Sequence, residues 1–291
     1  MRHSSSQSAT LIIVLGIITM VLQLTSYYLL DSVLLIVGTT ILLNLLCSHI
    51  LLEKSLNFES CFSYSLFNIF LSIIIILVSF LANTSVFAFE QLLLLFVAFN
   101  WLVPTLYCML RSLFNKSDKY DNFNTFFRNQ SIVFLLIYAA VLVYVLFLHN
   151  AEYIIYATDM DSINVIPFLT LAILIEDFIV GSASLTDIFH YVINSFILFL
   201  PFGFYTMLTM RRKSRFARLS VILLFPLSIE AIQLLLSLGK GDIDDILFGI
   251  IGSLMGALGY FILNEIFLTF TDEEFLYKRP SYSFYKNTLH Y

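Results

Sequence analysis

The sequence predicts an all-α, polytopic membrane protein with about eight transmembrane helices. Of its 291 residues, 59% are hydrophobic and only 12% are charged, and the mean hydropathy is +0.91. A soluble domain carries about 25% charged residues, so this chain has too few charges to cover a water-facing surface. The formal net charge is −5 without a long basic run, and nucleic acid is therefore not an expected partner.

Each predicted span is an apolar run of about 20 residues, the length that crosses roughly 30 Å of hydrocarbon. The first run follows Arg2 and His3 but is too long for a signal peptide and lacks a small-residue cleavage site, so we keep it as a span. The spans lie near residues 9–30, 32–52, 61–82, 87–110, 131–149, 188–210, 219–238 and 246–268.

A shorter apolar run, 169–175, follows Pro167 within the long segment 150–187. This run is too short to cross a bilayer, and proline suits the first turn of a helix. The segment carries six acidic groups and no lysine or arginine. We therefore expect an extracytoplasmic helix near 167–177 that is interfacial or re-entrant.

Basic residues set the predicted orientation. With both termini in the cytoplasm, 14 of the 15 lysines and arginines fall on the inner side, and only Lys240 lies outside. The basic loops around 111–128 and 211–218 are then cytoplasmic, as the positive-inside rule requires, and the outer face is acidic. This orientation is that of a multi-pass membrane protein with an even number of spans.

The basic stretch 111–130 divides the chain. We expect a four-span region at 1–110 of unassigned role, a cytoplasmic basic linker at 111–130, a second four-span region at 131–268 and a cytoplasmic tail at 269–291. No internal repeat relates the two regions, which argues against an inverted-repeat transporter. Single polar residues in the first four spans are interpreted as interhelical hydrogen bonds or helix ends; they are Gln23, Asn44, His49, Asn68, Glu90 and Asn100.

Glu230 is the strongest candidate for a functional side chain. It lies well inside an apolar span, where a charged carboxylate costs about 3 kcal/mol or more, and Gln233 is its neighbour on one helical face. Pro226 should kink the helix beside them. The alternative is a neutral glutamic acid that bonds a neighbouring helix. Asn194, in the preceding span, either lines the same cavity or bonds a neighbouring helix.

Three carboxylates open the last span, in the sequence Asp242-Ile243-Asp244-Asp245. Asp242 and Asp245 share a face if helical, and Asp244 points elsewhere. Aspartates at this position are also ordinary helix caps. The spacing does not indicate a metal site, and no cofactor is expected. Small residues in the same span let another helix approach closely; they are Gly249, Gly252, Ser253, Gly256, Ala257 and Gly259.

The ordered set of these motifs over roughly residues 131–268 resembles the VanZ-like family. The set consists of N-x-x-P-F at Asn164, Asn followed by P-x-G-F at Asn194 to Phe204, I-E-x-x-Q at Ile229 to Gln233, and D-x-x-D at Asp242 before the glycine-rich span. One departure is Gly249, where the family usually has asparagine. The resemblance implies a bacterial plasma-membrane protein of the cell envelope, because the namesake of the family is associated with resistance to teicoplanin.

Two main functions follow from the residues and the resemblance. In the first, an outward-facing polar pocket binds an amphipathic or lipid-linked ligand, such as a lipoglycopeptide or an envelope precursor. Its ligand-binding residues are Asn164, Asn194, Glu230, Gln233, Asp242 and Asp245. In the second, a membrane-embedded enzyme modifies a lipid or cell-wall precursor, with Glu230 as the catalytic base. An ion-coupled transporter is a weaker third alternative. The expected partners include membrane lipids, and the sequence predicts no oligomeric state.

Overall fold

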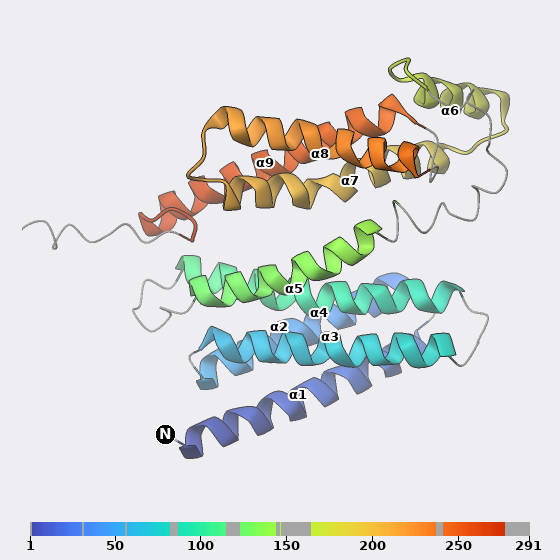
Figure 1. Ribbon diagram of the computed structural model, residues 1–291. Coiled ribbons are helices and arrows are strands. Elements are labelled where there is room, and N and C mark those ends of the chain that lie inside the picture. The colour runs from blue at the N-terminus through green and yellow to red at the C-terminus, as the bar shows by residue number, and fades with distance from the viewer. Residues whose placement is uncertain are drawn as a thin grey trace, which may run out of the picture. The chain divides into compact units, whose positions relative to one another are not determined.

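A computed structural model describes residues 2–30, 32–55, 57–81, 87–114, 123–143, 146, 164–236 and 241–276, and within this part every named element is a helix. Figure 1 shows these helices in chain order. Their bounds are α1 (Arg2–Leu29), α2 (Val33–Ser55), α3 (Phe58–Leu81), α4 (Phe87–Phe114), α5 (Phe123–Val143), α6 (Leu169–Val180), α7 (Leu185–Thr209), α8 (Arg215–Leu235) and α9 (Ile243–Thr271).

Seven of the described helices are long and apolar enough to cross a membrane, namely α1 to α5, α8 and α9. Helix α7 has 25 residues, and its described apolar part is the shorter stretch Phe196–Thr209. Each predicted span overlaps a helix, although α5 begins eight residues before the predicted span 131–149, whose last residues lie largely outside the described part of the chain. The all-α, polytopic class is confirmed, and the chain is a multi-pass membrane protein whose apolar helices contact membrane lipids. Which end faces the cytoplasm stays a prediction.

The chain divides into two compact units, residues 1–136 with 276–291 and residues 137–275. In the first unit, α1 to α4 surround a buried polar centre. The Asn100 amide oxygen accepts hydrogen bonds from Gln23 Nε2 at 2.7 Å and Asn44 Nδ2 at 2.8 Å, and Asn100 Nδ2 donates to Ser72 Oγ at 3.2 Å. All four side chains are fully buried. The predicted interhelical role of Gln23, Asn44 and Asn100 is confirmed.

The other single polar residues of this unit differ from one another. His49 bonds across to the Tyr107 hydroxyl in α4 at 2.7 Å, whereas Asn68 Nδ2 donates to the carbonyl of Tyr64 in its own helix at 3.0 Å. The side chain of Glu90 lies outside the described part of the chain. His49 therefore links two helices, whereas the hydrogen bond of Asn68 stays within α3, although the two residues look alike in sequence.

In the second unit, α7, α8 and α9 run side by side, and α6 lies at the end where α9 begins (Figure 1). The pair α7 and α9 is in the closest contact because its interface lacks side-chain bulk. A Cβ atom on Gly256 would stand 1.9 Å from the carbonyl oxygen of Leu200, and one on Gly252 would stand 2.2 Å from that of Phe196. The predicted close approach along the small residues is therefore confirmed.

Candidate functional site

The short helix α6 begins on a carboxylate that a different helix supplies. Its N-cap residue, Phe168, has left-handed backbone angles (φ 62°) and offers no side-chain cap. The N–H groups of Phe168, Thr170 and Leu171 instead donate to the side chain of Asp244, with Thr170 N at 3.0 Å and Leu171 N at 3.4 Å. The free N–H groups and the dipole of a helix start favour a negative charge there. Asp244 is fully buried, so this contact fixes α6 to the start of α9.

Asp242 holds the same segment by a second route. It is the N-cap of α9, and its side chain accepts from Asp244 N at 2.9 Å. Asn164 Nδ2 donates to Asp242 Oδ1 at 2.9 Å, and the Thr170 hydroxyl donates to Asp242 Oδ2 at 2.5 Å. The backbone of Asn164 also pairs with the chain around Asp242 in an isolated parallel bridge. The capping role that the sequence left open for Asp242 is therefore real, and it accompanies the contact with Asn164.

Glu230 joins this arrangement from α8. Its Oε1 atom accepts a hydrogen bond from the backbone N–H of Asp242 at 2.7 Å, and its side chain is only 6% exposed. Within the described chain this is the hydrogen bond that Glu230 makes, which leaves Oε2 without a partner there. Gln233, one turn further along α8, is also buried and donates to the carbonyl of Leu146 at 2.8 Å. The helix α8 thus directs both side chains inward.

The structure brings some of the predicted site residues together. Asn164, Glu230 and Asp242 form one hydrogen-bonded set, with Thr170 and Asp244 added to it; we call these five residues the polar cluster. Gln233 lies on the same buried face of α8 as Glu230 but bonds elsewhere. Asp245 is half-buried and close enough to act electrostatically on Glu230. Asn194 lies in α7, and its side chain is outside the described residues.

Sequence reasoning missed the central member of this cluster. Asp244 was expected to point away from Asp242 and Asp245, and this expectation is wrong: the chain turns at the N-cap Asp242, so Asp244 faces the start of α6. Thr170 was missed as well, although it is the only hydroxyl residue within the predicted helix 167–177. Tyr191 is a third omission, because its hydroxyl is buried beside Thr170 and the aspartates.

Neighbouring side chains fill the space beside Gly249, the position where the family usually has asparagine. A Cβ atom on Gly249 would stand 3.0 Å from the Pro226 Cβ atom and 3.1 Å from the ring of Phe199. An asparagine side chain would require one of these neighbours to move. Pro226 is buried in α8 one turn before Glu230, so proline and phenylalanine fill the space into which an asparagine side chain at position 249 would extend.

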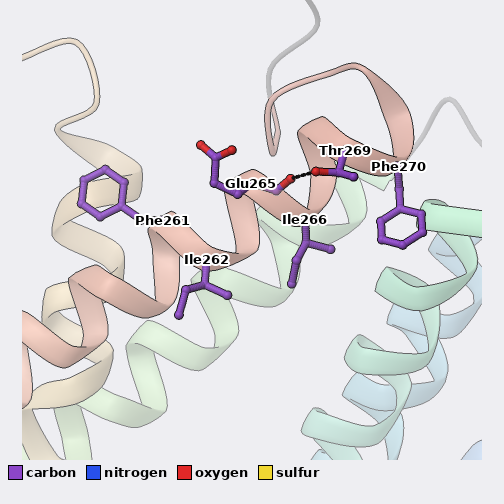
Figure 2. A pocket seen from close by; sticks show the side chains of 6 residues that line it. All are labelled: Phe261, Ile262, Glu265, Ile266, Thr269 and Phe270. Atoms are coloured by element: carbon purple, nitrogen blue, oxygen red, sulfur yellow. Dashed lines mark hydrogen bonds between the residues drawn. The ribbon is translucent and has the colours of Figure 1, made fainter.

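A separate groove lies along α9, away from these residues. It has a volume of about 470 Å³ and its lining is mainly apolar (Figure 2). The one carboxylate is that of Glu265, and the Thr269 hydroxyl donates to the Glu265 carbonyl at 2.8 Å. The lining residues are Phe261, Ile262, Glu265, Ile266, Thr269 and Phe270. None of the predicted site residues contributes to this groove.

Within the described residues, the chain is a multi-pass α-helical membrane protein. One of its two units carries the polar cluster at the end where α9 begins. The family model described as VanZ/LLP1 matches residues 133–264. This region, somewhat less than half of the chain, is therefore VanZ-like, and the match contains every member of the polar cluster and both glycine contacts described above. No curated protein and no solved structure matches the chain.

Proposed function

We propose that this is a bacterial plasma-membrane protein of the cell envelope that binds an amphipathic or lipid-linked ligand at the polar cluster and contributes to tolerance of lipoglycopeptides such as teicoplanin. The observation that carries the proposal is the convergence of Asn164, Glu230 and Asp242 from three separate segments. Membrane helices rarely bury such groups without a functional reason.

The orientation of the polar cluster supports an outward-facing site. The cluster lies where α8 ends and α9 begins, whereas the basic loop between α7 and α8 lies at the opposite ends of these helices. With the basic loop in the cytoplasm, the cluster faces the outer leaflet, where lipid-linked cell-wall precursors and lipoglycopeptides are found. In the proposed domain division, the four-span region 1–110 has no assigned role, the basic linker 111–130 joins it to the VanZ-like region 131–268, and residues 269–291 form the cytoplasmic tail.

The groups in this region divide into those that hold the site and those that contact a ligand. Asp242 and Asp244 are occupied by α6 and by the start of α9. Glu230 retains one carboxylate oxygen without a partner in the described chain, and Gln233 and Asp245 lie nearby. We assign ligand contact to Glu230 and Gln233, with Asp245 and Asn194 as further members. Asn164, although predicted to bind ligand, supports the site by positioning Asp242.

A membrane-embedded enzyme is the second candidate, and one specific observation favours it. The carboxylate of Glu230 is 6% exposed and has one oxygen outside any described hydrogen bond, which is the environment of a general base that takes a proton from a bound substrate. Replacement of Glu230 by glutamine separates the two functions. A binding site tolerates the isosteric amide, whereas a base loses its proton acceptor and turnover stops.

The test combines growth with direct measurement of the bound molecule. Cells producing Glu230→Ala should lose teicoplanin tolerance while the membrane level of the protein, measured by immunoblot, stays within about twofold of the wild type. Glu265→Gln is the control, because this glutamate lies in the α9 groove and outside the polar cluster. Mass spectrometry of the detergent-extracted protein should detect a co-purifying lipid or precursor that Glu230→Ala lacks. Unchanged tolerance and an unchanged lipid content in Glu230→Ala would refute the proposal.

A further inference from the structure

We propose a second binding site, for the head group of an anionic phospholipid, at the loop that joins α7 to α8. This site lies at the opposite end of these helices from the polar cluster and does not depend on the proposed function. Four cationic side chains occur within seven residues there: Arg212, Lys213, Arg215 and Arg218. Clusters of this size next to a membrane helix attract anionic lipids.

Two of these cations lie at the start of α8, where the helix dipole disfavours positive charge. Ser214 is the N-cap of α8, which places Arg215 at its first position and Arg218 in its first turn, and that turn contains no acidic residue. A helix start carries a partial positive charge and free N–H groups, so cations there destabilise it unless an anion is bound. The Ser214 side chain satisfies one N–H, that of Ala217, at 3.2 Å.

Within the described chain, no carboxylate neutralises these four residues. The acidic group that the loop does meet, Glu274, pairs with Arg211, which also donates to the carbonyl of Phe275. The guanidinium of Arg218 donates only to the thioether sulfur of Met207, at 3.7 Å, and its Nε atom is buried without a partner among the described residues. A buried guanidinium nitrogen in this state calls for a further acceptor.

The surface next to the cations identifies the source of the anion as a lipid. Phe216 is 81% exposed, and it begins a stripe of exposed apolar side chains that continues along α8 at helical spacing through Leu219, Leu223 and Leu227. A phosphate at Arg215 and Arg218 would place its acyl chains along this stripe. A free phosphate ion would pair with the cations but would leave the apolar surface uncovered, whereas a phospholipid would pair with the cations and cover that surface.

The experiment titrates the detergent-solubilised full chain with dioleoylphosphatidylglycerol, or with dioleoylphosphatidylcholine as the neutral probe, and counts bound lipid by native mass spectrometry. We expect tighter binding of phosphatidylglycerol. Lys213→Gln combined with Arg215→Gln should weaken its binding by roughly 25-fold, since each cation near a lipid surface contributes about fivefold, and should leave phosphatidylcholine unchanged. Both side chains are exposed, so this variant should fold.

The matched control removes two exposed cations elsewhere, by Lys54→Gln with Arg128→Gln. An equal loss in the control would show a general charge effect and overturn the site. The apolar-stripe variant Phe216→Ser separates a lipid site from a free-anion site. If 10 mM inorganic phosphate displaces phosphatidylglycerol equally well from this variant and from the wild type, the site recognises a free anion and the lipid assignment is overturned. Arg218→Gln provides a second variant, and phosphatidylglycerol binding unchanged in both variants would also refute the proposal.

Discussion

Replacement of Asp244 by asparagine tests whether α6 is held in place by a carboxylate from α9. In the wild type, three backbone N–H groups at the start of α6 donate to the two oxygens of Asp244. The amide of asparagine keeps one acceptor oxygen and turns an N–H₂ group toward donors that need an acceptor. The fold of α9 should persist, because its N-cap is Asp242.

The magnitude follows from the contacts that are lost. A hydrogen bond to a charged group contributes about 1.5–3 kcal/mol, and the contact with Leu171 N, at 3.4 Å, is the weakest of the three. Loss of the charge and of one strong acceptor should therefore cost about 3 kcal/mol in the docking of α6. Because 1.4 kcal/mol corresponds to a factor of ten, the opening equilibrium of this segment should rise by roughly 100-fold. Asp244 is fully buried, so solvent screening does not reduce this effect.

Hydrogen exchange detected by mass spectrometry measures the opening directly. Peptides that cover 164–180 should lose about two orders of magnitude of protection in Asp244→Asn, while peptides from α8 and the middle of α9 keep theirs. Glu176→Gln is the matched control, because this residue lies on α6 and is exposed. Unchanged protection at 168–171 in Asp244→Asn, or an equal loss in Glu176→Gln, would contradict the role assigned to Asp244.

Two further predictions concern helix packing. Gly256→Ala should lower the melting temperature of the detergent-solubilised protein by several degrees, because its Cβ would stand 1.9 Å from a backbone carbonyl oxygen. Gly259→Ala is the control and should be neutral or stabilising, because the space around its Cβ is open. Equal effects of the two substitutions would refute the close approach of α7 and α9. Asn100→Leu should destabilise the first unit by about 2 kcal/mol in a denaturant titration, since Gln23 loses its partner. Thr25→Val is the control, because the Thr25 hydroxyl donates to a carbonyl of its own helix. An equally large effect of Thr25→Val would contradict the prediction.

Much of the fold could be predicted from sequence because it depends on local composition. An apolar run of about 20 residues satisfies its own backbone hydrogen bonds only as a helix in the hydrocarbon, so the positions of the long helices follow from hydropathy. The short helix after Pro167 and the close packing around Gly252 also follow from local features, namely a proline at a helix start and small residues on one helical face. Glu230 stood out for the same reason, as a carboxylate inside an apolar run.

The partners of these residues could not be predicted, because they lie far away in the chain. Asp244 meets Thr170 across 74 residues, and Gln23 meets Asn100 across 77. Hydropathy and helical periodicity report only which face of a helix a residue occupies, and at a helix start even the face depends on where the cap falls. The sequence by itself determined that helices form and which polar groups they must accommodate. Only the tertiary structure decided which groups bond to one another, since interhelical hydrogen bonds depend on how the helices are placed side by side.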